Sequence, residues 1–336
     1  MTTSPLSRRR FLMISAAAVG VAGAAGAALA LPAQAGVQQV RWRGIALGAA
    51  AEIRLMTTDT AQADALLAAT EREIRRLEAI FSLHDKNSAL ARLNRDGRLD
   101  GPPLELVELL GLSARLHGAT DGAFDPSIQP LWALHAESHA ATGKAPGAAA
   151  IAEAHRLVGF DKVGIDSEAI RFGQTGMALT LNGIAQGFIT DRVSALLRAG
   201  GMTDLVVDMG EIRANGTNGG TGGWPVRLDP DHSAGAAAER LQLVDRAVAS
   251  SHARGTTFDK DGLAGHILDP RTGAPTTSSI TGASVVAGNA ALADGLSTAA
   301  LVADETTFAE ALRAFPGTRA RLVAADGTAR WLKAEG

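Results

Sequence analysis

Two stretches in the first half of the chain carry apolar residues at the spacing of an α-helix. Over residues 61–81, Leu66, Thr70, Leu77 and Phe81 fall near a single stripe. Asp59 or Thr60 can accept hydrogen bonds from the first free N–H groups, so the pattern predicts a capped helix. A second stripe follows Pro103, a residue that suits the first helical turn, and predicts a helix through about residue 117. Its apolar positions are Leu106, Leu109, Leu110 and Leu116.

Shorter patterns predict the remaining elements. Alternation over residues 51–56 predicts a strand, and the apolar run 205–207 predicts a short buried strand. Residues 160–172, and the Asp326-Gly327 turn between two apolar pairs, predict hairpins. Further helices are expected over 146–158, over 187–199 and from a cap at Asn289 through about 302, and a glycine-rich loop over 215–223.

The order of these elements predicts the fold class. Strands and helices are interleaved, but without the regular strand–helix–strand period of a parallel α/β fold. We therefore expect an α+β fold with mixed or antiparallel sheets packed against helices. No fixed-period repeat and no linker divides the chain, so residues 36–336 are expected to form one compact domain.

The first 35 residues have the pattern of an export signal. Paired arginines at Arg8-Arg9-Arg10 precede Phe11-Leu12, an apolar run reaches Leu31, and residues 33–35 (AQA) offer a cleavage site. The pattern predicts export by the twin-arginine machinery to the periplasm. The alternative is an uncleaved membrane anchor, because the apolar run approaches the length that spans a bilayer.

Charge and cysteine content exclude several kinds of partner and site. Removal of residues 1–35 leaves 29 basic and 35 acidic residues, a net charge of −6. That balance argues against nucleic acid as a partner, since phosphate contacts need clustered Lys and Arg. The chain has no cysteine, which excludes disulfides, thiolate metal sites and cysteine nucleophiles.

The most informative motif lies near the C-terminus, where Asp294 and Thr298 are four residues apart. On a helix their side chains share one face. Mg²⁺ accepts oxygen ligands of this kind, often only one or two from protein, with water and phosphate completing the shell. The pair is therefore a candidate metal site, and the alternative is an ordinary buried pair on a small-residue helix.

Three other motifs have both a functional and a structural interpretation. The Asn182-Gly183 turn precedes a helix whose first N–H groups could bind phosphate, or it is simply a tight turn. Asp125, which stands before a proline, could accept hydrogen bonds from adenine or ribose, although capping of the next helix is favoured. His266 could act as a general base beside a metal-bound phosphate, but a lone histidine is more often structural.

Together these motifs, in this order, resemble the ApbE family of FAD:protein FMN transferases. The similarity runs from about residue 44 to 304 and combines nine short patterns, each weak alone. They are SLHDKNSALARLN (82–94), GAFDP (122–126), VGFDKV (158–163), LNGIAQG (181–187), DMGEIR (208–213), WPVRLDP (224–230), VASS (248–251), HILDPRTG (266–273) and ADGLST (293–298).

The resemblance implies a two-lobed ApbE-like fold and a reaction. Members of this family use Mg²⁺ and FAD, transfer FMN to a Thr or Ser hydroxyl of a partner flavoprotein, and release AMP. Phosphoryl transfer needs positioning and charge neutralisation more than a nucleophile on the enzyme. That requirement agrees with a chain that offers no strong nucleophile–base pair.

The resemblance also assigns residues by position. Asp294 and Thr298 are implied as Mg²⁺ ligands, with the backbone carbonyl of Gly183 as a third. His266 is implied as a general base that acts with Asp294 in catalysis. Contacts to FAD are implied at Leu47, His84, Ala123, Phe124, Asp125, Thr180, Gln186 and Leu268.

The chain departs from the general family pattern at several positions. Thr180 stands where most members have Asp, Gln186 where many have Lys, and His84 where Tyr is common. The segment TLNGIAQG (180–187) and the form DMGE (208–211) resemble the NosX subgroup, which implies a membrane-bound NosR-type acceptor and a role in nitrous-oxide reductase maturation. Two alternatives stay open: a Mg²⁺-dependent pyrophosphatase that cleaves FAD to FMN and AMP, and a non-catalytic FAD-binding assembly factor.

Overall fold

The computed structural model describes residues 36–228 and 239–333, and the predicted export signal lies outside them. Its centre is an eight-stranded sheet in which every neighbouring pair is antiparallel. In sheet order the strands are β1 (Gln38–Ala46), β2 (Ala49–Thr57), β6 (Leu205–Asp208), β7 (Ile212–Asn215), β10 (Ala247–His252), β13 (Ile280–Ala287), β14 (Arg319–Ala324) and β15 (Ala329–Lys333). None of the helices in the described ranges is long and apolar enough to cross a membrane.

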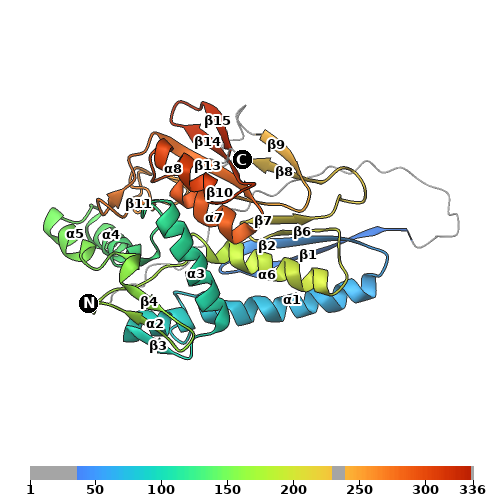
Figure 1. Ribbon diagram of the computed structural model, residues 1–336, viewed down its shortest axis with the longest axis horizontal. Helices are drawn as coiled ribbons and strands as arrows, with labels where there is room; N and C mark the ends of the chain where they lie inside the picture. Colours follow the sequence, from blue (N-terminus) through green and yellow to red (C-terminus); the bar gives the residue numbers. More distant parts are fainter. Residues whose placement is uncertain (1–35, 229–238, 334–336) are drawn as a thin grey trace.

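The two faces of this sheet belong to different cores because side chains alternate along each strand. Leu205 and Val207 of β6 pack with helices, whereas Val206 packs with the hairpin of β8 (Trp224–Leu228) and β9 (Glu239–Leu243). The helices of the larger core include α1 (Thr60–Phe81), α3 (Leu104–Ala119), α6 (Ala185–Ala199), α7 (Ala290–Ala299) and α8 (Glu305–Arg313). Figure 1 shows α1 and α6 along one side of the sheet and β8–β9 beyond its other side.

A smaller lobe lies at the end of the molecule where α4 and α5 are seen in Figure 1. A three-stranded antiparallel sheet in the order β3-β5-β4 forms part of it. Its elements are α2 (Ala89–Asp96), β3 (Arg98–Asp100), the 3₁₀ turns η1 (Pro126–Ile128) and η2 (Phe160–Lys162), α4 (Gln129–Thr142), α5 (Ala148–His155), β4 (Val163–Ile165), β5 (Ala169–Phe172), β11 (Leu268–Asp269) and β12 (Ala274–Pro275).

Most predicted elements are confirmed, with shifted ends. Asp59 is the N-cap of α1 and accepts from Gln62 N at 2.9 Å. The buried stripe of α1 contains Thr70, Leu77 and Phe81 as predicted, and Leu67 in place of Leu66, which is half-buried. All four leucines predicted for α3 are fully buried. The helix predicted from Asn289 is α7, but it ends at Ala299 and not near 302.

Several elements were not predicted. The strand prediction did not extend to β1, although its positions alternate between exposed and half-buried from Val40 onward and it pairs with β2 along nine positions. Helix α4 carries apolar and histidine residues around its circumference and presents no clear stripe. Both elements are stabilised by the neighbours they pack on, which a local pattern does not reveal.

The backbones of α6 and α7 approach each other closely at Gly187. A Cβ placed on Gly187 would lie 2.4 Å from the backbone oxygen of Ala290, so only glycine permits this approach. Gly111 of α3 is the contrasting case, since a Cβ there meets no atom within 4 Å.

We predict that Gly187→Ala lowers the free energy of unfolding by about 1–3 kcal/mol, because the added methyl forces the two helix backbones apart. Gly111→Ala is the matched control and should raise it by about 0.5–1 kcal/mol, since alanine suits a helix interior and has room here. Urea denaturation of both variants checks the prediction. Equal effects at the two positions would contradict it.

Candidate functional site

A large cavity of about 2060 Å³ is lined by residues of both the main sheet and the smaller lobe. Ala49, Val206 and Ser250 line it from the sheet, and His84 and Trp132 from the other side. Its volume is more than twice the roughly 300–1,000 Å³ of ordinary small-molecule pockets. It therefore has room for a dinucleotide-sized ligand and for a segment of a second molecule.

All twelve residues predicted for the site line this one cavity, although they are spread along the sequence from Leu47 to Thr298. Their roles as ligands remain predictions, but their convergence is a property of the fold. The set is Leu47, His84, Ala123, Phe124, Asp125, Thr180, Gly183, Gln186, His266, Leu268, Asp294 and Thr298.

The corner between α6 and α7 holds the predicted metal ligands. A Cβ on Gly183 would lie 3.0 Å from Thr298 Oγ1, so the Gly183 backbone and the Thr298 hydroxyl are immediate neighbours. One turn earlier on α7, Asp294 Oδ2 accepts a hydrogen bond from Gly187 N at 3.3 Å. Asp294 and Thr298 therefore share the face of α7 that meets the start of α6, as their spacing predicted.

Buried acids surround this corner. Burial raises the pKa of Asp294 to about 8, and burial together with Asp294 and Asp208 raises the pKa of Glu211. Glu211 Oε2 is buried and has no hydrogen-bond partner among the described residues. A bound divalent cation would offset this buried negative charge, so the site suits a hard cation electrostatically.

The donors at this corner fit Mg²⁺ in particular. Across residues 36–228 and 239–333, no three His, Cys, Asp or Glu side chains are grouped so as to hold a metal ion. The candidate ligands are instead one carboxylate, one hydroxyl and one backbone carbonyl, all oxygen. Mg²⁺ is commonly held by few protein ligands and keeps water or phosphate in its remaining positions.

His266 is held in one tautomer. Its Nδ1 lies 2.9 Å from the carbonyl oxygen of Thr256, which can only accept, so Nδ1 carries the proton. The neutral ring then presents Nε2 as an acceptor. Burial, with a smaller contribution from His252, lowers the pKa of His266 and keeps the ring neutral at neutral pH. A neutral, oriented imidazole on the cavity wall has the properties of a general base.

The predicted capping role of Asp125 is confirmed, since it is the N-cap of η1. Its Oδ1 accepts from Ser127 N at 2.7 Å and from Ser127 Oγ at 2.6 Å, and Oδ2 accepts from Phe160 N at 3.3 Å. The carboxylate thus ties the start of η1 to η2 while it also lines the cavity. Capping and ligand contact are compatible here, since a carboxylate has about four acceptor positions.

Leu47 occupies a strained turn at the cavity wall. It has φ of 46°, and with Gly48 at 80° it joins β1 to β2. A left-handed backbone is unfavourable for leucine, and strain of this kind is often found at functional sites. Glu78 Oε1 on α1 accepts from Leu47 N at 2.7 Å and holds the turn in place.

The sequence analysis did not assign several lining residues to the site, among them Arg54, Glu211 and His252. Arg54 of β2 brings a positive charge to the cavity wall, where it stacks over Trp224 at 5.6 Å and pairs with Glu52 at 3.2 Å. Glu211 lies within the DMGEIR motif and His252 directly follows the VASS motif. Only the tertiary structure shows that both residues line the cavity. Gln186 itself donates from Nε2 to Met209 O at 3.3 Å.

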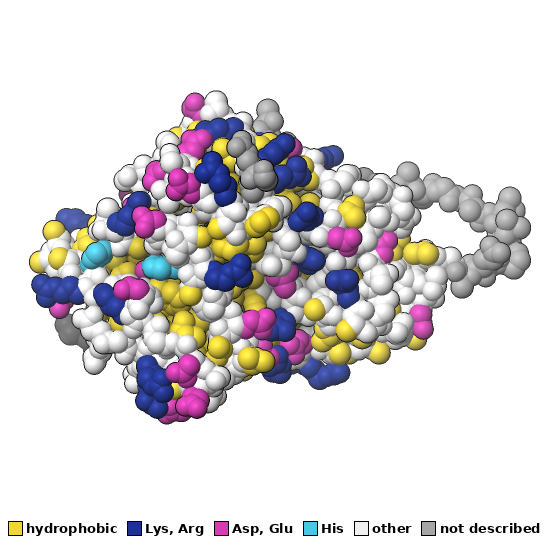
Figure 2. All heavy atoms as spheres, in the orientation of Figure 1, with side chains coloured by type: hydrophobic (Ala, Val, Ile, Leu, Met, Phe, Trp, Pro, Cys, Tyr) yellow, Lys and Arg dark blue, Asp and Glu magenta, His cyan; other side chains and the backbone are white. Residues whose placement is uncertain are grey.

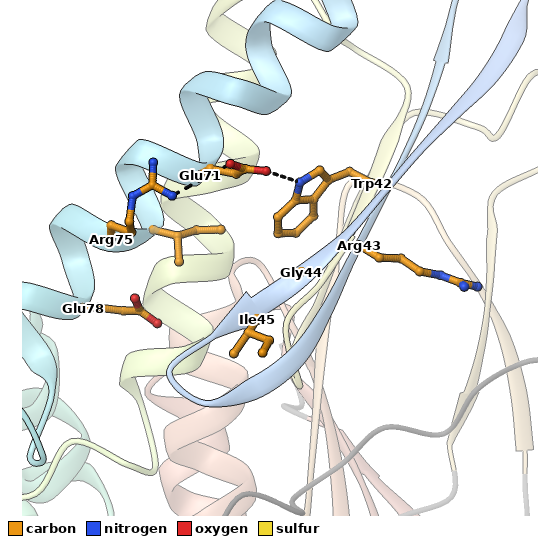
Figure 3. A pocket seen from close by; sticks show the side chains of 8 residues that line it. Trp42, Arg43, Gly44, Ile45, Glu71, Arg75 and Glu78 are labelled. Atoms are coloured by element: carbon orange, nitrogen blue, oxygen red, sulfur yellow. Dashed lines mark hydrogen bonds and ion pairs between the residues drawn. The ribbon is translucent and has the colours of Figure 1, made fainter.

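A second hollow, between β1 and α1, is too small to compete as the main site. It measures about 180 Å³, below the roughly 300 Å³ of small-ligand pockets. Figure 3 shows Trp42 reaching Glu71 across it, with Nε1 to Oε1 at 2.9 Å, and Arg75 on the far side of Glu71. These contacts fasten β1 to α1.

The exposed face drawn in Figure 2 carries Lys and Arg interspersed with Asp and Glu. No extended single-sign patch dominates that face. Hydrophobic side chains gather across its middle, over the region of α3 and α7 in Figure 1.

Comparison with known proteins identifies close matches in one family. The ApbE family matches residues 47–322. The FAD:protein FMN transferase of Haemophilus influenzae is 28% identical over 243 residues, covering 68% of this chain and 70% of that protein. The FAD:protein FMN transferase of Treponema pallidum is 29% identical over 278 residues, covering 75% of each.

Solved structures show the same fold. The flavin transferase ApbE from Vibrio cholerae superposes with a TM-score of 0.77 at 22% identity, covering 88% of this chain and 96% of that one. The Pseudomonas stutzeri flavinyl transferase ApbE, in its apo form, superposes with a TM-score of 0.76 at 24% identity, covering 89% and 98%. The predicted α+β, ApbE-like class is confirmed.

Strain at Leu47 can be measured by comparing two variants that both lose the leucine side chain. We expect Leu47→Gly to be more stable than Leu47→Ala by about 1 kcal/mol, because glycine adopts the left-handed conformation without the Cβ clash. Chemical denaturation of the two variants gives the difference. A more stable alanine variant would show that the turn is relaxed.

Proposed function

The chain belongs to the ApbE family and is a transferase, and from that premise we propose that it is a Mg²⁺-dependent FAD:protein FMN transferase. It attaches FMN from FAD to a Thr or Ser hydroxyl of a partner flavoprotein and releases AMP. The observation that carries the proposal is the meeting of Gly183, Asp294 and Thr298 at one corner of a cavity that also contains His266.

Each group has a task in this reaction. Gly183, Asp294 and Thr298 would hold Mg²⁺, which supplies charge neutralisation on the pyrophosphate when bound. The residues carried over for FAD, including Phe124 and Leu268, place apolar surface along the same wall. His266 Nε2 takes the proton of the acceptor hydroxyl as its oxygen bonds to the FMN phosphorus. The bond from that phosphorus to the AMP oxygen breaks, and AMP leaves.

The acceptor enters as a segment of another protein, because the cavity is larger than one dinucleotide needs. The NosX-like features of the chain favour a membrane-bound, periplasm-facing acceptor of the NosR type, and hence a role in nitrous-oxide reductase maturation. The twin-arginine pattern of residues 1–35 supports periplasmic action of a domain over residues 36–336.

Replacement of Asp294 tests the metal site. Asp294→Asn should lower FMN transfer by about 10²-fold or more, as expected when a charge that acts in the transition state is removed. The fold should survive, because Asp294 is a buried carboxylate whose neutral form is already favoured. Fluorescence of the acceptor after denaturing electrophoresis, with FAD and Mg²⁺ supplied, measures transfer. Unchanged transfer would remove Asp294 from the site.

The pH dependence tests His266. Because the base must be neutral and its pKa is lowered, the transfer rate at saturating Mg²⁺ should rise with pH below the ordinary histidine value of about 6.5 and be level by pH 7. His266→Gln should reduce the rate by about 10²–10⁴-fold and abolish this rise. If the same rise persists in the glutamine variant, another group is the base.

The alternative activities give different products in the same assay. A pyrophosphatase would release AMP from FAD and Mg²⁺ rapidly without any acceptor. A non-catalytic assembly factor would bind FAD yet leave an acceptor with a Thr target site unlabelled. Acceptor-dependent AMP release together with covalent labelling supports the transferase over both.

A further inference from the structure

One carboxylate on α6 is bonded to the backbone of α7. Asp191 Oδ1 accepts from Ala290 N at 2.8 Å, and Oδ2 accepts from Ala291 N at 2.9 Å. Both donors are the first residues of α7, the helix that carries Asp294 and Thr298. Asp191 itself lies one helical turn after Gly187, whose backbone touches α7 directly.

The start of α7 is fully bonded, and its partners come from two sources. The local cap, Asn289 Oδ1, accepts from Leu292 N at 2.8 Å. The first two N–H groups, which have no partner within a helix, are both taken by Asp191. From β7, Arg213 Nη1 donates to the backbone oxygen of Gly288, so the turn before α7 is also held from the sheet.

We propose that Asp191 is a positioning residue for the metal site: it sets the height and rotation of α7 against α6. This inference rests on the proposed function. Gly183 lies in the turn that leads directly into α6, while Asp294 and Thr298 come from α7, so the three predicted ligands converge only if the two helices keep one register.

The two hydrogen bonds from the α7 backbone to Asp191 matter because the position of α7 must be held accurately. A slip of one residue along α7 moves each side chain by about 1.5 Å and 100°. Side chains one and two turns from the start of the helix, where Asp294 and Thr298 lie, would then leave the corner. Asn289 cannot prevent such a movement, because it belongs to the same chain segment and would move with the helix.

Magnesium titration of the full chain by calorimetry tests the proposal without relying on catalysis. Asp191→Ala should raise the Mg²⁺ dissociation constant by about 10–100-fold, the range seen when groups that orient metal ligands are lost. Asp191→Asn keeps one acceptor oxygen and should lie between that variant and the wild type. In the transfer assay, Asp191→Ala should raise the Mg²⁺ concentration for half-maximal rate more than it lowers the rate at saturation.

Asp304→Ala is the matched control. Asp304 caps α8 through Thr307 N at 3.0 Å and does not line the cavity, so its loss removes the same kind of bond elsewhere. Its melting temperature should fall, while its Mg²⁺ dissociation constant stays within about twofold of the wild type.

The outcomes separate this inference from the proposed function. If Asp191→Ala changes only the melting temperature, as Asp304→Ala does, Asp191 is merely structural and the inference is overturned. Should the alanine variant fail to fold, the same criterion applies to Asp191→Asn. A wild-type chain that binds no Mg²⁺ would overturn both this inference and the proposed metal site. Acceptor labelling without bound Mg²⁺ would retain the transferase and reject the metal-positioning role.

Discussion

The contact between the backbones of α6 and α7 is the constraint on which the candidate site depends. Gly187 lets the two helices approach so closely that its missing Cβ would overlap the backbone oxygen of Ala290. The same contact lets Gly187 N reach the Asp294 carboxylate. A larger residue would separate the helices and, with them, the oxygen atoms that come from each.

Acidic side chains close to this contact are unfavourable for stability when they are charged. Asp294 and Glu211 are buried close to the half-buried Asp208, and removal from solvent raises the pKa of each of the three carboxyls. An acid cluster of this kind weakens a fold unless a cation or proton compensates it. A group of acids beside the α6–α7 contact is expected at a cation-binding site and is not expected in an apolar core.

Part of this architecture follows from the chain locally. The cap at Asp59, the leucine stripe of α3 and the cap at Asn289 act between residues a few positions apart, so they are readable from spacing. The exposed strand β1 and the helix α4 could not be found in this way. Trp132 and His135 of α4 pack on Phe258, a partner that is distant in sequence, and β1 is held by its pairing with β2.

The sequence by itself determined the local groups that the predicted site uses: a carboxylate and a hydroxyl one turn apart, a glycine turn before a helix, and a histidine in a turn. Those are local facts, set by helical periodicity and by backbone freedom at glycine. Only the tertiary structure decided that Gly183 lies beside Thr298, that Asp191 holds the start of α7, and that Glu211 and Arg54 belong to the same cavity. Such convergence depends on how helices pack and strands pair across more than a hundred residues, and no short pattern encodes it.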